Sequence, residues 1–326
     1  MSSCWDDTPA EENGGEEGGG EAPSGKKEFV MSLIGGTYQD VNQGDTLPLR
    51  VIVRNADHVE YAWNQNGKVV SSDSIYRFVA KSTGTYPIDL SVKSDQKDTL
   101  VALAIHVYPV LPPVDSIGDI RSWTGAGPHR AALMVQWIRG TEWEAPERGN
   151  VHVLCWGYRW QADAKPTGQG MIEAVAKADK RLFVMLGRGF SDVGGNKHSI
   201  RGFGYDANGD GKFSIRHSVT GQVYTAADFK EGMLELSGND TGDKYVSEDS
   251  ADFWAGGWLE NYWSYWLAQS ATLPEGRSFS YSQLMADLRP LVNNSWDAWT
   301  FSSINSGHVN TYVFSEWAVA AEAVGR

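Results

Sequence analysis

Alternating apolar and polar positions mark the first third of the chain. From about Phe29 to Tyr108, runs such as LPLRVIVRN, SIYRFVA and LVALAIHVYP largely alternate, and turn-forming residues separate them. Because successive side chains of a strand point to opposite faces, each run has one face suited to burial. Short strands at this spacing predict a β-sandwich over residues 28–108, with Trp63 in its core.

Two segments of this region, YAWNQNGKVV and STGTYPIDLSV, resemble immunoglobulin-like (Ig-like) and polycystic-kidney-disease-type domains. The resemblance implies a spacer or adaptor module. Three prolines follow in YPVLPPVDS. Because proline fixes the backbone and cannot donate to a sheet, we expect a stiff linker over residues 109–118.

The remaining residues, 119–326, combine both hydrophobic periods. AALMVQWI and VHVLCWGYRW predict strands, and TGQGMIEAVAKAD places its apolar residues on one face of a helix over residues 168–178. Two more helices are predicted, in TAADFKEGMLEL from a cap at Thr225 and in SYSQLMADLRPLV up to about Pro290. This mixture, without regular strand–helix alternation, predicts an α+β domain.

Acidic residues outnumber basic ones: 41 Asp and Glu against 28 Lys and Arg give a net charge of -13. Such a charge repels nucleic acid and anionic membrane surfaces, so we exclude both as direct partners. The sequence also lacks a stretch of roughly 20 apolar residues that a membrane-spanning helix needs.

The two cysteines have different surroundings. Cys155 lies in an apolar run, where a thiol behaves as a small buried hydrophobe. Cys4 lies in residues 1–27, an acidic, glycine-rich segment that predicts a disordered tether. Cys4 with Asp6 and Asp7 resembles the acylated cysteine and acidic export signal of Bacteroidetes surface lipoproteins. The resemblance implies a lipid on Cys4 that anchors the chain at the outer-membrane cell surface; a cloning artefact is the alternative.

Familiar catalytic motifs are missing from the sequence. It has no G-x-S-x-G elbow, P-loop or H-E-x-x-H motif, and its seven histidines show no metal-ligand spacing. We therefore expect no enzymatic activity. A glycosidase needs only two carboxylates that converge in space, so Glu235, Asp252 and Glu260 remain candidates for that alternative.

The segment DANGDGKFSIRH matches the first half of a calcium-binding loop. Asp206, Asn208 and Asp210 offer side-chain oxygens, and Lys212 offers its carbonyl. His217 stands where a bidentate glutamate belongs, so a carboxylate from elsewhere must complete the shell. We expect a structural calcium ion; a hairpin turn without metal is the alternative.

Tryptophan is concentrated beyond the linker, where 12 of the 14 lie. Large rings in excess of what a core needs become exposed, and exposed patches mark binding sites. If residues 262–268 form a strand, Tyr262 and Trp266 share one face and Trp263 and Tyr265 the other, so one pair can be displayed. The rings expected at a ligand site are Trp156, Tyr158, Trp160, Trp258, Tyr262, Trp263, Tyr265, Trp266, Trp296 and Trp299.

The second domain also resembles a known family. Its segments WTGAGPHRAALMVQWI, CWGYRWQADAKPTGQGM and ENYWSYWLAQ are similar to cobalamin-binding surface lipoproteins of Bacteroidetes vitamin B12 uptake systems. The resemblance implies that the chain captures cobalamin or another corrinoid and passes it to a TonB-dependent outer-membrane transporter, without chemistry. For such a ligand, Arg159 is a candidate partner of rim amides or a phosphate. His308 or His129 is a candidate ligand of cobalt.

Other functions fit the same features. A surface glycan-binding protein uses the same tether, spacer and rings, because sugars also pack their apolar faces on aromatic side chains. A purely structural adhesin is a further alternative, as are a salt-bridged Arg159 and solvated histidines.

Overall fold

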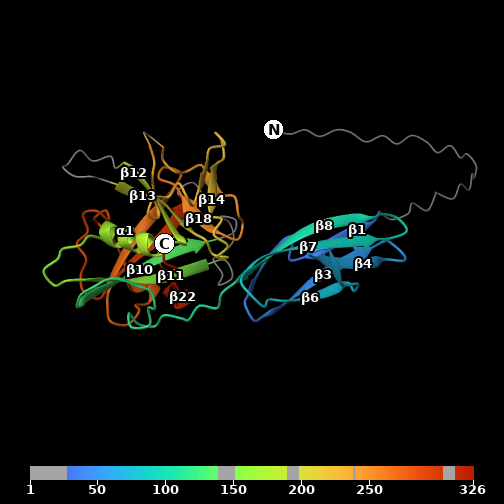
Figure 1. Cartoon of the computed structure of the whole chain (residues 1–326), viewed down its shortest axis with the longest axis horizontal. Helices are drawn as coiled ribbons and strands as arrows, with labels where there is room; N and C mark the ends of the chain where they lie inside the picture. Colours follow the sequence, from blue (N-terminus) through green and yellow to red (C-terminus); the bar gives the residue numbers. More distant parts are fainter. Residues whose placement is uncertain (1–27, 139–150, 189–197, 238–239, 304–312) are drawn as a thin grey trace, which may run out of the picture.

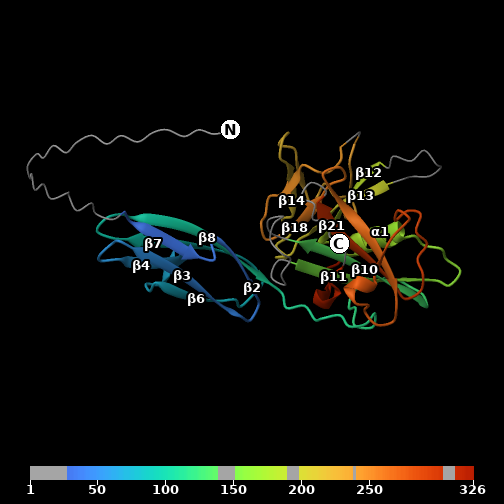
Figure 2. The ribbon, with the colours of Figure 1, turned by 180° about the vertical axis from the view of Figure 1, so that it is seen from behind.

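The computed structural model describes residues 28–138, 151–188, 198–237, 240–303 and 313–326. Strands of residues 30–108 lie at one end of an elongated molecule, and the later strands with the helix lie at the other (Figure 1). Figure 2 shows the same separation from behind. The described part of the chain is therefore multi-domain and built mainly from β-sheets.

The N-terminal domain is a sandwich of two sheets. One has the order β1 (Val30–Ile34), β3 (Thr46–Arg54), β6 (Ile75–Val79). The other has the order β2 (Tyr38–Asn42), β8 (Thr99–Tyr108), β7 (Gly84–Lys93), β4 (Glu60–Gln65), β5 (Lys68–Ser71). Alternation places Leu49, Val51, Ile88 and Leu90 between the sheets around the fully buried Trp63. The predicted β-sandwich is confirmed.

A large sheet forms the centre of the second domain. Its order is β20 (Ser280–Tyr281), β19 (Asn261–Gln269), β21 (Ser295–Ser303), β10 (His129–Ile138), β11 (Val151–Trp160), β22 (Ala318–Ala320), and β9 (Trp123–Gly125) also pairs with β11. Here β21 runs parallel to β10, with Ala131 opposite Ser295. Antiparallel pairing of β19 with β21 makes their two aromatic runs neighbours, with Tyr265 opposite Trp299.

Two smaller sheets complete the domain. One has the order β16 (Met233–Glu235), β12 (Leu182–Arg188), β13 (His198–Tyr205), β18 (Phe253–Gly256), and the other β15 (Val223–Thr225), β14 (Ser214–His217), β17 (Tyr245–Ser247). Short 3-10 turns lie at Gly276–Ser278 and Ser315–Trp317.

Both faces of the large sheet are buried, as β10 illustrates. Leu133, Val135 and Trp137 belong to a core that also contains residues of β12, β13 and the helix. Ala132 and Met134 face a second core, formed with Ile117 and other residues of the chain termini of this domain. A strand buried on both sides reads as a continuous apolar run, which explains the segment AALMVQWI.

The predicted helix over residues 168–178 is present as α1 (Gly168–Ala178), where the Thr167 side chain accepts the N–H of Gly170. The two other helices do not form, so an α+β domain is not supported: within the described residues α1 is the one α-helix. After Thr225, backbone φ angles of 52° at Glu231 and 86° at Gly232 turn the chain into β16. Residues 280–281 instead pair with β19, and Leu284 and Leu288 remain exposed.

Candidate functional site

A single carboxylate organises the turn between β18 and β19. Asp243 accepts the backbone N–H groups of residues 258–261 at 3.0 to 3.1 Å. Burial raises the pKa of Asp243, but hydrogen bonds from Thr241 and from these backbone groups outweigh it and leave the pKa below its usual value. A side chain at Gly257 would come within 2.5 Å of the Asp243 carboxylate. These hydrogen bonds therefore fix the conformation of the turn, which includes the half-buried Trp258.

The buried side chain of Arg201 packs against the ring of Trp258. The Arg201 guanidinium lies 4.0 Å from the centre of the Trp258 ring, close enough for a cation–π interaction. Burial lowers the pKa of Arg201 to about 10, against the opposing charges of Asp243 and Asp240. Arg201 remains charged at neutral pH, so the ring rests on a fixed positive charge.

The rings of this turn line a cavity of about 250 Å³. Side chains of β13, β19, β21 and the segment after β20 surround it: Ser199, Ile200, Trp258, Tyr262, Trp263, Tyr265, Tyr281, Ser282, Gln283, Leu284, Met285, Ala286 and Trp299. We call it the aromatic pocket. It brings together Trp258, Tyr262, Trp263, Tyr265 and Trp299 of the rings predicted from sequence.

Trp299 lies beneath this pocket with an unsatisfied donor. Its ring stacks on Tyr265 at 4.3 Å and 10°, and its side chain is 5 % exposed. Among the described residues, the buried indole N–H of Trp299 has no hydrogen-bond partner. An unmade hydrogen bond is costly in such a buried position.

The neighbouring Tyr265 is tied into the core instead. Its hydroxyl donates to Asp297, and Ser295 donates to the other oxygen of the same carboxyl at 2.7 Å. Burial raises the pKa of both groups, with the charge of Asp297 adding to the effect on Tyr265. Tyr265 therefore contributes its ring to the pocket wall while its hydroxyl serves the fold.

The two faces of β19 are unlike, but neither is wholly displayed. Trp263 and Tyr265 are 4 % and 5 % exposed and belong to the main core. On the other face, the half-buried Trp266 packs edge-on against Tyr281, and its indole N–H donates to Ser264. Tyr262 is half-buried at the aromatic pocket.

Other predicted ligand residues lie elsewhere. Trp156 and Trp296 are fully buried, with indole N–H groups bonded to Asp179 and to the Ser270 carbonyl, each at 2.9 Å. They are core residues.

A second aromatic group lies at the end of β11 and does not line the aromatic pocket. Tyr158 stacks on Trp160 at 5.9 Å, the Arg159 guanidinium lies 4.4 Å from the Trp123 ring, and His129 meets Trp160 edge-on. His308 and Cys4 lie outside the described residues.

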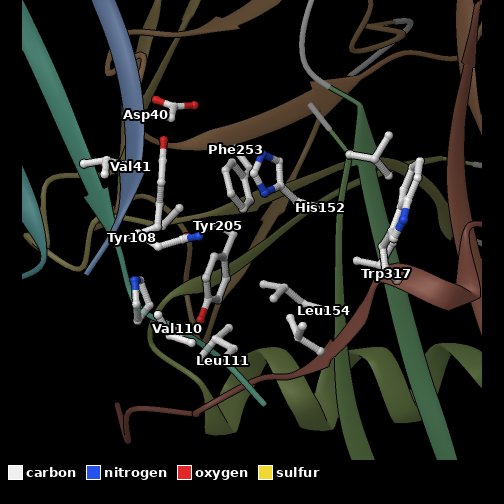
Figure 3. A pocket seen from close by; sticks show the side chains of 16 residues that line it. Asp40, Val41, Tyr108, Val110, Leu111, His152, Leu154, Tyr205, Phe253 and Trp317 are labelled. Atoms are coloured by element: carbon white, nitrogen blue, oxygen red, sulfur yellow. The ribbon is translucent and has the colours of Figure 1, made fainter. Parts of the chain in front are cut away.

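A larger cavity of about 520 Å³ lies between the two domains. Figure 3 shows Phe253 and His152 side by side, Tyr205 below them, and Tyr108 and Trp317 on opposite sides. The His152 and Phe253 rings stack at 4.2 Å. The walls of this cavity come from β2, β8, β11, β13, β18 and β22, so both domains contribute to it.

The predicted calcium loop lies near this junction, between β13 and β14. Asp206 and Asn208 are each 3 % exposed, and Asp210 and Lys212 form an ion pair at 3.5 Å. Among the described residues, no group of three or more His, Cys, Asp or Glu side chains has an arrangement ready to hold a metal ion.

The carboxylates considered for a glycosidase have separate surroundings. Glu260 pairs with Lys244 at 2.6 Å, and Glu235 lies in β16. Asp252 is buried and accepts the N–H of Ala207 at 3.2 Å. None of the three lines the aromatic pocket or the cavity between the domains.

Several residues of the site were not predicted from sequence. Arg201 and Asp243 lie outside the aromatic runs, and Tyr281, Gln283 and Met285 lie in the segment that was predicted to be a helix. One signal was available: two adjacent glycines, Gly256 and Gly257, indicate a close backbone approach inside an aromatic run.

No family model and no curated protein matches the chain. Solved structures with partial similarity include a quinonprotein alcohol dehydrogenase-like protein from Bacteroides thetaiotaomicron, at 17 % identity over 24 % of this chain and 20 % of that chain, with a TM-score of 0.22. The fibronectin(III)-like modules of Clostridium thermocellum CbhA match at 16 % identity over 25 % of this chain and 99 % of that chain, with a TM-score of 0.21. Bacteroides ovatus SGBP-B in complex with a mixed-linkage heptasaccharide matches at 11 % identity over 83 % of this chain and 70 % of that chain, also with a TM-score of 0.21.

The chain spans a fifth of the length of the first of these structures. At such TM-scores, these similarities carry no argument about function, and the resemblance to cobalamin-binding lipoproteins remains a prediction. Among the described residues, no helix is long and apolar enough to cross a membrane.

Proposed function

We propose that the chain is a non-catalytic binding protein whose aromatic pocket holds part of a corrinoid, cobalamin or a close relative. The single observation that carries this proposal is the pocket itself, whose wall is made largely of aromatic rings: Trp258, Tyr262, Trp263, Tyr265 and Trp299. A ligand with a broad apolar face packs against such rings. The sequence resemblance supplies the choice of corrinoid.

The volume of the pocket limits how the ligand binds. Pockets that enclose a drug-sized molecule measure about 300 to 1,000 Å³, whereas the aromatic pocket measures about 250 Å³. A corrinoid is larger than a drug, so only its edge enters. The rest lies on the neighbouring exposed apolar residues Leu284, Met285 and Leu288.

The same proposal includes a lipid on Cys4 that anchors the chain at the outer-membrane surface. There the chain passes the corrinoid to a TonB-dependent transporter. An acidic tether of residues 1–27 gives the binding domain reach from the membrane.

Titration of the full chain with cyanocobalamin tests the proposal. We expect quenching of tryptophan fluorescence and a coloured protein after desalting. Trp258→Ala removes an aromatic wall and should weaken binding about 10- to 100-fold, the equivalent of roughly 1.5 to 3 kcal/mol. Trp123→Ala is the matched control, because Trp123 is also half-buried beneath an arginine but lies outside the pocket. A colourless natural chain with no quenching contradicts corrinoid binding.

A second candidate is a surface glycan-binding protein. The observation that favours it is the small volume of the pocket, which fits one ring-sized group beside the exposed amide of Gln283. A panel of glycans titrated against the same variants separates the two ligands. Glycan binding that is lost in Trp258→Ala, without any response to cyanocobalamin, would select this candidate.

A further inference from the structure

The loop over residues 206–212 has the backbone turns of a cation-binding loop. Asp206 accepts the N–H of Gly211 at 2.9 Å, Asn208 that of Asp210 at 3.0 Å, and Asp210 that of Lys212 at 2.9 Å. These bonds form the turns of the loop, in which Asp206 and Asn208 are buried and Asp210 is exposed. By themselves they also fit a plain turn, so the argument needs a separate observation.

That observation is Asp252, a buried carboxylate from the segment before β18. Its Oδ1 accepts the N–H of Ala207 at 3.2 Å, which places Asp252 against the loop. Asp206 and Asp252 are only 3 % and 4 % exposed. Within the described part of the chain, Oδ1 of Asp206 and Oδ2 of Asp252 are both buried without a hydrogen-bond partner. Each such buried oxygen without a partner is costly.

The electrostatics agree with this geometry. Burial raises the pKa of Asp252 to about 8, and the charges of Asp206 and Asp249 add to the effect. Burial likewise raises the pKa of Asp206, more than the hydrogen bonds from Gly211 and Gly209 lower it. Burial is the largest cause of both shifts.

We propose that Asp252 completes a calcium site with Asp206, Asn208, Asp210 and the carbonyl of Lys212. Hard oxygen ligands that include several carboxylates suit Ca²⁺, which takes 6 to 8 oxygens in flexible geometry. Three carboxylates do not yet surround one point among the described residues. One reason is that Asp210 pairs with Lys212 at 3.5 Å, a largely exposed contact that Asp210 exchanges for the ion.

The position of this site gives it a role between the domains. Asn208 donates to Thr85 in β7 and to Asp249, each at 3.1 Å. The adjacent Ser250 bonds to His106 at 3.1 Å, and the Ala251 carbonyl accepts from the Tyr108 hydroxyl at 3.0 Å. An ion that ties the loop to Asp252 fixes both segments that contact the sandwich. Calcium therefore stiffens the junction between the domains.

Calorimetric titration and thermal melts of the full chain test this site. We expect one Ca²⁺ per chain, and a melting temperature that rises about 5 to 10 °C at calcium concentrations 100-fold above the Kd. Mg²⁺ should give a much smaller shift. Asp210→Asn, on the exposed side of the loop, should weaken calcium binding at least 10-fold. Asp163→Asn, an exposed aspartate in another turn, should leave it unchanged.

Asp252→Asn separates a metal ligand from a structural carboxylate. Because asparagine keeps the shape of Asp252 but cannot supply a carboxylate to the ion, the variant in EDTA should melt close to the temperature of the natural chain in EDTA, yet gain nothing from calcium. A calcium-free variant that melts well below the natural chain contradicts the proposal. So does a natural chain that shows neither heat of binding nor a melting shift, or calcium affinity unchanged in both variants.

Discussion

Asp243 shows how much of the candidate site depends on one side chain. Its carboxylate accepts four backbone N–H groups and lies beside the buried Arg201. Charge-assisted hydrogen bonds are stronger than neutral ones. Asp243→Asn keeps the shape but removes the charge, so we expect a loss of about 2 kcal/mol in the free energy of unfolding and weaker ligand binding through a loosened Trp258.

The control for this change is Asp163→Asn, which removes a charge from an exposed turn. Chemical denaturation and ligand titration of both variants provide the measurement. Equal stability of Asp243→Asn and the natural chain would show that the turn holds itself without the carboxylate.

The depressed pKa of Asp243 also predicts a dependence on pH. A carboxyl whose pKa is lower in the folded than in the unfolded state stabilises the fold above its unfolded pKa, and this stability is lost as pH falls through the folded pKa. The loss therefore falls below about pH 4. We expect the melting temperature of the natural chain to fall more steeply than that of Asp243→Asn in this range. Parallel curves for the two chains would contradict the assignment.

Some aromatic residues of strand β19 serve folding and others are proposed to serve binding, so substitutions can separate the two roles. Tyr265→Phe removes the hydroxyl that donates to the buried Asp297 but keeps the ring beside Trp299. An unpaired buried acceptor costs about 1 to 3 kcal/mol, so we expect lower stability with unchanged ligand affinity.

Tyr262→Ala is the reciprocal change on the same strand. Tyr262 is half-buried and lines the aromatic pocket, so we expect ligand affinity to fall at least 10-fold while the melting temperature changes by only a few degrees. Melts and titrations of the two variants together measure this division. Loss of binding in Tyr265→Phe with none in Tyr262→Ala would reverse the proposed roles.

These elements also show what sequence patterns can predict. Alternation predicted the strands of the sandwich, because burial on one face gives a sequence a hydrophobic period of two. The expected second helix was wrong because positive φ angles at Glu231 and Gly232 end any helical turn there. In the expected third helix, Leu284 and Leu288 supply an apolar period, but the chain leaves both exposed beside the pocket. A binding surface and a helix face look alike in sequence.

The arrangement of the whole domain was beyond sequence patterns because it depends on distant pairings. Parallel pairing of β10 with β21 brings Ala131 opposite Ser295, and the Asp243 carboxylate reaches a turn 15 or more residues away. Sequence reasoning therefore predicted rings of the aromatic pocket but not the cation and carboxylate that position them. The same limit applies to the proposed calcium site. The loop motif indicated that a carboxylate from elsewhere in the chain must complete it, but the sequence did not show that Asp252 lies there.

Contacts between the domains provide the last test. The Tyr108 hydroxyl donates to the Ala251 carbonyl at 3.0 Å in a buried position, next to the proposed calcium site. Tyr108→Phe removes this bond and leaves a buried carbonyl without its donor, which costs about 1 to 3 kcal/mol. We expect faster proteolysis at the exposed Val110, in the predicted linker between the domains, and a smaller protective effect of calcium on it.

Tyr61→Phe is the matched control, because the Tyr61 ring packs on the sandwich core away from the junction. Limited proteolysis with and without calcium, followed by mass spectrometry of the fragments, compares the two variants. If the linker of Tyr108→Phe is cut no faster than that of Tyr61→Phe, the bond does not hold the domains together. The junction would then depend on the Asn208 and His106 contacts instead.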